Sequence, residues 1–556
     1  MFPRKRWRIL NTDPTRSIVD VLLENRNLPA DHLEPFKLSD KMHSPYLLPD
    51  MEIGVARVLR AIEKGEKICI FGDYDVDGIT STALMIYFFR KINYPVTWNL
   101  PHREKNGYGL RASTVDQIAK TGTNLIITVD NGISAHEAIN HASELGIDVV
   151  VTDHHLQEGD LPNSAAVINP NRTDSQYPFK TICGAVVAFK FIYAISEKLM
   201  AEEDVKQFLL DQLDLVCIGT IADVMPLRDE NYALVKFGLK VLTKTKKPGL
   251  IELKNIAGVN QKTITPISVG FFLAPRLNAS GRIEEADIGL ELLISESHEN
   301  AYKTAAYLNE LNRKRQKLQS GYLQEALAQL SKDETDIDKA IIVERLNWQA
   351  GLIGLISSQL KEKYARPVIA FTQDEEGNYV GSARSIDDFH ITNALTRFSQ
   401  YFINYGGHRK AAGLTVYREK YEIFKKEFMA YVNETLQNNH LSPELVIDSI
   451  VDIDQINLNN ARTIQDIGPF GETNPEPVFL LKNALIREII PMSNGKHLKI
   501  YIQKSSQIYE AVWWNSGDLK NEFFFGGVID IACKININIW RGTDRLQLII
   551  EDIAIH

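Results

Sequence analysis

Cysteine is scarce in this chain. Four cysteines are spread through 556 residues, and no two of them form a C-x-x-C pair. This spacing argues against a disulfide framework and against a cysteine zinc site. We therefore expect Cys69, Cys183, Cys217 and Cys533 to be buried thiols.

Long apolar runs and an excess of positive charge are also missing. No apolar run reaches the roughly 18 residues of a membrane helix, and the basic start, "MFPRKRWRILN", lacks the apolar stretch of a signal peptide. We therefore expect a cytoplasmic protein that does not contact membranes. The 62 Lys and Arg against 71 Asp and Glu leave a net charge of −9, so a polyanionic partner would have to bind in a local cationic groove.

The hydrophobic pattern predicts an α/β protein with several domains, because a chain of this length exceeds one hydrophobic core. Short β-rich runs alternate with helical stretches from 66 to 171, which predicts a parallel sheet with crossover helices. Period-2 alternation after about residue 445 predicts a small β-barrel, with the OB-fold among the candidates. The predicted parts are an N-terminal segment (1–45), a large α/β domain (46–298), a connector helix (299–332), a smaller α/β domain (333–440) and an OB-like barrel (445–556).

Acidic and imidazole side chains follow three of the predicted strands. Asp73, Asp75 and Asp77 follow "KICIF", Asp130 follows "NLIITV", and the Asp-His-His triplet 153–155 follows "DVVVT". Because ligands bind outside the carboxyl ends of parallel strands, these like charges should converge, which costs free energy unless a cation neutralises them. Mixed carboxylate and imidazole donors suit Mn²⁺ or Mg²⁺. Two such ions, about 3.5 to 4 Å apart, would activate water and stabilise the leaving oxygen in a phosphoryl displacement.

One further acid is ambiguous on local grounds. Asp223 in "GTIADVMPL" follows an apolar helix, where it could be a metal ligand or only a helix-end cap. Aromatic residues of the tail raise a similar question. Tyr501, Tyr509, Trp513, Trp514 and Trp540 could stack the bases of a single strand or could form the core of the barrel.

The successive motifs resemble those of the DHH phosphoesterase superfamily. They are "GDYDVDG", "TVDNGIS", "VTDHH" and "GTIADVMPL", and "GGHRKAAG" at 406–413 resembles the DHH-associated domain. The segments "PHREKNGYGL", "PRLNASGRI", "GSARSI" and "GPFGETNPEPVF" narrow the resemblance to the RecJ family of single-stranded-DNA exonucleases, over almost the whole chain. The resemblance implies that 46–298 is a DHH catalytic domain and 333–440 a DHH-associated, substrate-binding domain.

The resemblance also implies which residues act. The candidate metal ligands are Asp73, Asp75, Asp77, Asp130, His154 and Asp223, and His155 faces the scissile phosphate. The catalytic set is then Asp75, Asp77, Asp130, His154, His155 and Asp223. Which acid binds which ion stays open, since some relatives place a His where this chain has Phe71. A 5′-phosphate pocket of Arg276, Ser382, Arg384 and His408 is implied, with Arg103, Tyr108, Asn278 and Arg282 as further substrate-binding residues.

Three functions compete. The first is a 5′-to-3′ exonuclease that releases mononucleotides from single-stranded DNA in repair and recombination. The second is a DHH-type phosphodiesterase of short oligonucleotides or cyclic dinucleotides, which would not need the C-terminal barrel. The third is a DNA-binding scaffold that has lost its metals, which the complete set of motif acids and both histidines of the triplet argue against. We predict the first function, in a monomer, with single-stranded DNA as the substrate and a single-strand-binding protein and a recombination helicase as candidate protein partners.

Overall fold

The computed structural model describes residues 5–101, 109–259, 264–284, 286–330, 338–437, 441, 443–540 and 543–555. The chain divides into two compact units. The first unit is Glu34–Lys314 with Gly468–Pro475, and the second is Met1–Leu33, Arg315–Ile467 and Glu476–His556. No helix among the described residues is long and apolar enough to cross a membrane. All four cysteines are buried and unbridged, as expected.

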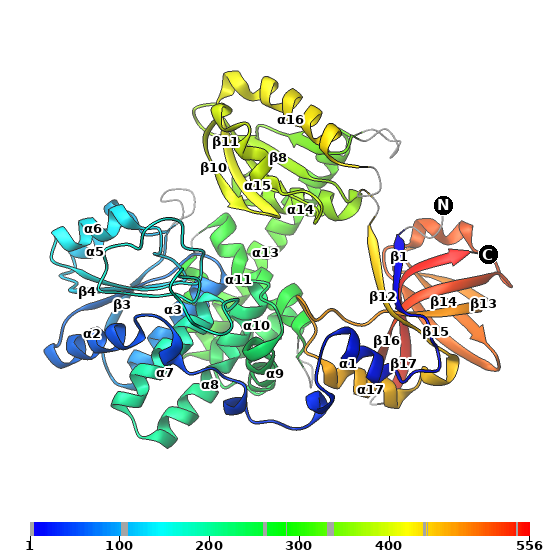
Figure 1. The fold of residues 1–556 in the computed structure, drawn as a ribbon, viewed down its shortest axis with the longest axis horizontal. Helices are drawn as coiled ribbons and strands as arrows, with labels where there is room; N and C mark the ends of the chain where they lie inside the picture. The colour runs from blue at the N-terminus through cyan, green and yellow to red at the C-terminus, as the bar shows by residue number, and fades with distance from the viewer. Residues whose placement is uncertain are drawn as a thin grey trace. The chain divides into compact units, whose positions relative to one another are not determined.

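A five-stranded parallel sheet forms the centre of the first unit (Figure 1). Its strand order is β3 (Val96–Asn99), β2 (Ile68–Phe71), β4 (Leu125–Val129), β5 (Asp148–Thr152) and β6 (Ala166–Ile168). Helices α5 (Ala112–Ala119) and α6 (His136–Glu144) cover one face, and α2 (Met51–Lys64), α3 (Val76–Lys91) and α7 (Gly184–Leu199) cover the other. Alternate residues of β2 enter the two cores, Ile70 one and Phe71 the other. The predicted parallel α/β sheet is confirmed.

A helical layer completes the first unit. It consists of α8 (Glu202–Ala222), α9 (Asp229–Thr243), α10 (Pro248–Ala257), η4 (Ser268–Leu273), α11 (Ala274–Ile283), α12 (Asp287–Leu293) and the first part of α13 (His298–Leu327). η4 is a π-helix that continues directly into α11. α13 is long enough to cross the boundary between the two units, since its last residues belong to the second.

The second unit contains a five-stranded mixed sheet. Its order is β10 (Phe402–His408), β11 (Ala411–Val416), β9 (Tyr379–Arg384), β8 (Val368–Gln373) and β7 (Ile341–Glu344), and only β7 and β8 run parallel. Helix α14 (Ala350–Tyr364) packs on one face, while α15 (Ile391–Thr396) and α16 (Tyr421–Thr435) pack on the other. This matches the second α/β pattern of the sequence.

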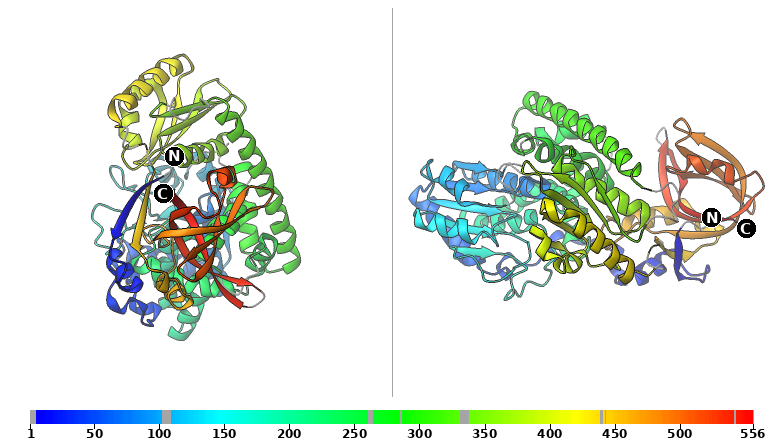
Figure 2. Two further views of the ribbon diagram at one scale, coloured as in Figure 1. Left: turned by 90° about the vertical axis from the view of Figure 1, so that its right-hand side faces the viewer. Right: turned by 90° about the horizontal axis from the view of Figure 1, so that it is seen from above.

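The C-terminal part of the second unit is a closed β-barrel. Its strands are β13 (Phe479–Met492), β14 (His497–Lys504), β15 (Gln507–Trp513), β17 (Thr543–Ile555) and β16 (Val528–Trp540), and β16 pairs back with β13 (Figure 2). The predicted OB-like barrel is therefore confirmed. Strand β12 (Glu444–Ile450) extends the sheet, α17 (Leu458–Ile467) follows it, and β1 (Arg6–Asn11) pairs with β12 in parallel, so the start of the chain lies beside its C-terminal part (Figure 1).

The remaining helices are short. They are α1 (Ile18–Asn25) and the 3-10 turns η1 (Ala30–Leu33), η2 (Leu38–Asp40), η3 (Pro45–Leu47), η6 (Ser399–Tyr401), η7 (Arg418–Lys420), η9 (Ile453–Gln455) and η10 (Gly517–Glu522). Helix α1 begins at Ser17, whose side chain accepts a hydrogen bond from the Asp20 N–H and so caps the helix. It joins β1 to the loop that leads into the first unit.

Candidate metal centre

The carboxyl ends of β2, β4 and β5 bring the predicted acids and histidines together, because the three strands are parallel neighbours. Three groups have ligand atoms within 4.8 Å of one another: Asp73 with Asp75 and Asp130, Asp77 with His154 and Asp223, and Asp130 with His154 and His155. These groups contain all six predicted metal ligands. Asp223, whose role was ambiguous in the sequence, ends α8 and reaches the same cluster.

Two helix N-termini hold the acids that follow β2. Asp75 caps α3, and its carboxylate accepts the Gly78 N–H at 3.1 Å. Asp77 accepts the N–H groups of Gly184 and Ala185, at 2.6 and 2.9 Å, from the first turn of α7. Unsatisfied N–H groups and the helix dipole favour negative charge at these positions. The fold therefore stabilises carboxylates here before any cation is considered.

Glycine is required where α7 meets the acids. A Cβ on Gly184 would lie 2.6 Å from the Cβ and Oδ1 atoms of Asp130. Asp130 itself has a left-handed backbone, with φ of 62°, and its N–H donates to the Thr152 carbonyl at 3.0 Å. This close approach sets the position of the Asp130 carboxylate between β4 and α7.

Asp153, the first residue of the triplet, orders the turn after β5. Its Oδ1 accepts the N–H groups of His154 and His155, at 2.7 and 3.0 Å, and lies 2.7 Å from His155 Nδ1. Its Oδ2 accepts the Ile133 N–H at 2.9 Å. The side-chain amides of Asn169 and Asn171 donate to the carbonyls of His155 and His154. The sequence singled out Asp153 with the triplet, as one of the donors at the strand ends and not as a support for the histidines. Asn169 and Asn171 were not predicted, because nothing local in the sequence marks a residue that acts through another.

His154 is turned towards the acids. Its Nε2 atom lies 3.1 Å from Asp130 Oδ1, 3.7 Å from Asp223 Oδ2 and 3.8 Å from Asp77 Oδ2. Burial lowers the pKa of His154, although the charge of Asp77 opposes this shift. A neutral imidazole surrounded by carboxylates is suited to bind a metal ion.

Burial and mutual repulsion disfavour the charged forms of four of these acids. Burial, followed by the charge of a neighbouring aspartate, raises the pKa of Asp73, Asp75, Asp130 and Asp223. The buried Asp73 Oδ1 and Asp223 Oδ2 atoms accept no hydrogen bond from the described residues. Hard oxygen donors with an imidazole fit Mn²⁺ or Mg²⁺. Phe71 is fully buried in the core beneath, so it contributes no donor.

His155 differs from His154 in charge. Burial would lower its pKa, but the hydrogen bond to Asp153 and the nearby carboxylates raise the pKa of His155 to about 9. This shift favours the protonated ring. A cation held at the edge of the acidic cluster is suited to contact a phosphate oxygen.

The η4–α11 helix lies across this site. A Cβ on Gly281 of α11 would lie 2.7 Å from the carbonyl oxygen of Tyr74, between Asp73 and Asp75. A Cβ on Gly270 of η4 would lie 3.8 Å from Ile221 Cγ2, near the end of α8. The predicted substrate residues Arg276, Asn278 and Arg282 are all on α11, so the fold places them on a helix that packs against the aspartate loop.

Two hydrogen bonds orient Arg276. Its Nε donates to Asn309 Oδ1 on α13 at 3.1 Å, and its Nη1 donates to the Phe272 carbonyl at 2.6 Å. The guanidinium is partly buried, and burial lowers the pKa of Arg276, as does the charge of Arg313 one turn beyond Asn309. A second cation near Arg276 makes an anion at this position more favourable.

The other predicted phosphate-binding residues lie in the second unit. Ser382 and Arg384 are on β9, and His408 ends β10. Arg384 and His408 both pair with Ala411 of β11, so they share one end of the sheet. A Cβ on Gly354 of α14 would lie 3.0 Å from Ser382 Oγ, which shows how closely this helix approaches β9. The pocket shared with Arg276 stays a prediction, and Arg103 and Tyr108 lie outside the described residues.

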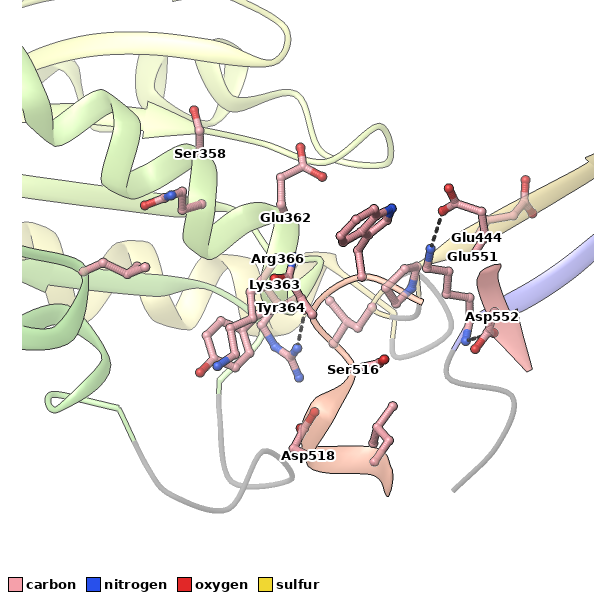
Figure 3. Close-up of a pocket in the computed structure, with 18 of the residues that line it drawn as sticks. Ser358, Glu362, Lys363, Tyr364, Arg366, Glu444, Ser516, Asp518, Glu551 and Asp552 are labelled. Atoms are coloured by element: carbon pink, nitrogen blue, oxygen red, sulfur yellow. Dashed lines mark hydrogen bonds and ion pairs between the residues drawn. The ribbon is translucent and has the colours of Figure 1, made fainter. Parts of the chain in front are cut away.

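The candidate stacking residues of the barrel differ in exposure: Tyr501 is half-buried, and the side chain of Trp540 lies outside those that the structure describes. Tyr509 and Trp513 are buried, whereas Trp514 is 52% exposed. Trp513 and Trp514 line a pocket of about 1790 Å³ in the second unit, which contains none of the predicted metal or phosphate ligands. Figure 3 shows that side chains of both signs, among them Glu362, Lys363 and Arg366, surround this pocket, so it is not a cationic groove.

Three family models match this chain. They describe a DHH family N-terminal domain at residues 67–220, a DHHA1 domain at 338–437 and a RecJ OB domain at 447–552. Together they cover both α/β regions and the barrel. Nothing in these matches assigns roles to single residues.

Curated relatives and solved structures agree with the models. The single-stranded-DNA-specific exonuclease RecJ of Bacillus subtilis (strain 168) is 36% identical over 92% of this chain, which spans 64% of that protein. The RecJ of Salmonella typhimurium is 34% identical over 91% of this chain and 90% of its own length. The crystal structure of Thermus thermophilus RecJ with Mn²⁺ matches with a TM-score of 0.83 at 27% identity, over 100% of this chain and 80% of that one. The Mg²⁺ complex matches with a TM-score of 0.76 at 26% identity, over 99% and 78%.

Proposed function

The chain belongs to the RecJ family of single-stranded-DNA-specific exonucleases, and from this we propose that it hydrolyses single-stranded DNA from the 5′ end and releases mononucleotides. The observation that carries the proposal is the cluster of acids and histidines at the ends of β2, β4 and β5. The C-terminal barrel supports a long strand as substrate, because the alternative substrates, cyclic dinucleotides and short oligonucleotides, would leave it without a role. The role in the cell is DNA repair and recombination.

The residues fit a divalent cation. Asp73, Asp75, Asp77, Asp130, His154 and Asp223 hold Mn²⁺ or Mg²⁺, bound as two ions, and the related RecJ structures that contain Mn²⁺ and Mg²⁺ support this assignment. Bound there, the ions supply an activated water and stabilise the leaving oxygen. Asp153 contributes no ligand atom, but it fixes the turn that aims His154 at the acids.

The chain's own side chains orient the strand. Protonated His155, held by Asp153, offers a proton and a positive charge to the scissile phosphate. Arg276, Ser382, Arg384 and His408 bind the terminal 5′ phosphate, while Arg103, Tyr108, Asn278 and Arg282 contact the first nucleotides. A terminal phosphate carries more charge and one more oxygen than an internal diester, so a pocket of cations favours an end of the strand.

We propose the partners of the enzyme as well. Single-stranded DNA is the substrate, and a single-strand-binding protein and a recombination helicase are the candidate protein partners. The enzyme acts as a monomer on DNA in the cytoplasm. Sedimentation velocity of the purified full chain, with and without a single-strand-binding protein, measures both the oligomeric state and that interaction.

A degradation assay tests the activity. The purified full chain is incubated with a 5′-phosphorylated single strand, the same strand as a blunt duplex, and a linear dinucleotide, each with Mn²⁺, Mg²⁺ or a chelator. We expect mononucleotides from the single strand only, and only with a metal ion. A label at the 5′ end should appear at once as a mononucleotide, whereas a label at the 3′ end should pass through progressively shorter strands. Cleavage of the dinucleotide alone would contradict the proposal.

A further inference from the structure

Several large apolar side chains are exposed on η4. Phe271 is 76% exposed, Phe272 44% and Ile267, directly before η4, 56%. In a π-helix the hydrogen bonds link residues about five apart, so these three side chains share one face of the turn. Val269 and Leu273, on the other side, are fully buried. The sequence "ISVGFFL" therefore anchors one face in the core and presents another, containing two phenylalanines, to solvent.

The π-turn that carries this apolar face, which we call the η4 platform (Ile267, Phe271 and Phe272), packs against α8, the helix that ends at a candidate metal ligand. η4 contacts the end of α8 through Gly270 and Ile221, two residues before the candidate ligand Asp223. At its other end η4 continues into α11, where Arg276 donates a hydrogen bond to the Phe272 carbonyl at 2.6 Å. The platform thus lies on the segment between a candidate metal ligand and a predicted phosphate ligand.

Packing of the first unit does not account for this arrangement. Single exposed apolar residues are ordinary, but a π-turn has poorer hydrogen-bond geometry than an α-helix and often marks a functional site. Val224, directly after Asp223, is also 64% exposed and has φ of 55°, a strained conformation for a β-branched residue. Exposed aromatic rings beside guanidinium groups are the combination that proteins use for single-stranded nucleic acids.

We propose that the η4 platform is a binding site for a nucleobase, on which Phe271 stacks a base of the unpaired substrate strand while Arg276 holds a phosphate. This rests on the proposed function and deepens it. Every base offers a π-face, so the site is indifferent to sequence. A base in a duplex must first leave its partner and its stack. The platform therefore contributes to the choice of single strands over duplexes.

Abasic substrates provide the test. Binding of a 5′-phosphorylated strand is measured by fluorescence anisotropy in chelator for the full-length protein, together with kcat and KM in Mn²⁺. A second strand lacks the bases of its first three nucleotides and keeps its phosphates. We expect Phe271→Ala to weaken binding of the normal strand about five- to a hundredfold and to change binding of the abasic strand little. Phe271→Trp should bind the normal strand as wild type does.

The matched control is Ile53→Ala, which removes an exposed apolar side chain, 56% exposed against 76% for Phe271, from α2 on the opposite face of the sheet from α6. This variant should bind the normal and the abasic strand as tightly as wild type does. Equal loss on normal and abasic strands with Phe271→Ala would overturn the proposal, because the ring would then not contact a base. Unchanged strand binding with an altered sedimentation coefficient would also overturn it and would identify the platform as a protein contact.

The outcome separates the two proposals. If the wild-type chain degrades no single strands, the proposed function itself is wrong. If it degrades them and Phe271→Ala behaves as wild type on the normal strand, the base site alone is wrong. Melting temperatures of all variants are measured in parallel, and we expect no change, because the substituted side chain is largely in water.

Discussion

Individual residues in the metal centre divide into those that offer ligand atoms and those that hold them. Asp130 and Asp223 bring charge to the cluster, and their pKa values are raised by burial and by Asp77. Asp153 has its oxygens committed to backbone N–H groups and to His155, and its pKa is lowered although burial alone would raise it. Asp130 and Asp153, at the ends of neighbouring strands, thus have opposite pKa shifts, because their hydrogen-bond partners differ.

Repulsion among the acids predicts the behaviour of a charge-neutral variant. Asp130→Asn keeps the shape of the side chain and removes one charge, so we expect it to abolish cleavage. Without a metal ion, its free energy of unfolding should equal or exceed that of wild type, because repulsion is relieved. Cleavage assays and thermal melting in chelator measure the two effects. A variant that melts well below wild type in chelator would contradict the presence of a metal site here.

Arg384 provides a test of end recognition at a single residue. A charge-assisted hydrogen bond to a phosphate is worth roughly 1.5 to 3 kcal/mol, which is about ten- to a hundredfold in rate. We expect Arg384→Ala to lower activity on 5′-phosphorylated strands by this factor and to narrow the preference over 5′-hydroxyl ends. The preference is measured as the ratio of the cleavage rates on two otherwise identical oligonucleotides, one with a 5′ phosphate and one with a 5′ hydroxyl, both labelled at the 3′ end. An unchanged ratio in both Arg384→Ala and Arg276→Ala would place end recognition elsewhere.

At the level of elements, α13 connects the two units and also contacts the site. Asn309 on α13 accepts a hydrogen bond from Arg276, and Tyr307 donates one to Glu284 at the end of α11. α13 therefore holds α11 at two points. Because Asn309 is neutral, it orients the guanidinium of Arg276 without cancelling its charge.

The hydrogen bond between Asn309 and Arg276 predicts that Asn309 affects cleavage only by orienting Arg276. A neutral hydrogen bond contributes about 0.5 to 1.5 kcal/mol, so Asn309→Ala should lower kcat/KM on 5′-phosphorylated strands about two- to tenfold and leave 5′-hydroxyl strands unaffected. In the Arg276→Ala variant, the additional Asn309→Ala substitution should leave kcat/KM unchanged. Tyr307→Phe is the control, because it removes the neighbouring hydrogen bond from α13 and not the one to Arg276. Additive losses in the double variant would show that Asn309 does not act through Arg276.

On the scale of the whole molecule, the two ends of the chain fold together in the second unit. Strand β1 pairs with β12, and Arg26 forms a buried ion pair with Asp448 at 2.6 Å. Asn25 and the Val478 N–H also donate to Asp448. The N-terminal segment is thus part of the second unit, and a truncation of residues 1–33 would expose the outer side of β12.

Removing one partner of this buried pair should destabilise the second unit. Arg26→Ala leaves the Asp448 carboxylate buried with weaker partners, which costs about 3 kcal/mol. Arg6→Ala is the control, since its ion pair with Glu444 is solvent-exposed and should contribute less than about 1 kcal/mol. Urea unfolding of both variants measures the difference. Equal stability of the two would mean that β1 and α1 are not needed to hold the barrel.

The sequence by itself determined the features that depend on local pattern. Alternating apolar runs and helices indicate the parallel sheet, and the rule for strand ends places Asp73, Asp130 and His154 at one edge of it. Period-2 alternation in the tail indicated the barrel. Each of these inferences needs only neighbouring residues and a general rule of sheet geometry.

Tertiary structure alone decided which side chains face solvent and which distant segments meet. Trp513 is buried and its neighbour Trp514 is exposed, and Phe271 is exposed to solvent although Val269 and Leu273 of the same apolar run are buried. Asp153 turned out to hold the two histidines, and Asn309 meets Arg276 from a helix that the local pattern indicated only as a connector. Burial and orientation depend on contacts between residues far apart in the chain, and a local pattern of apolar and polar residues does not contain them.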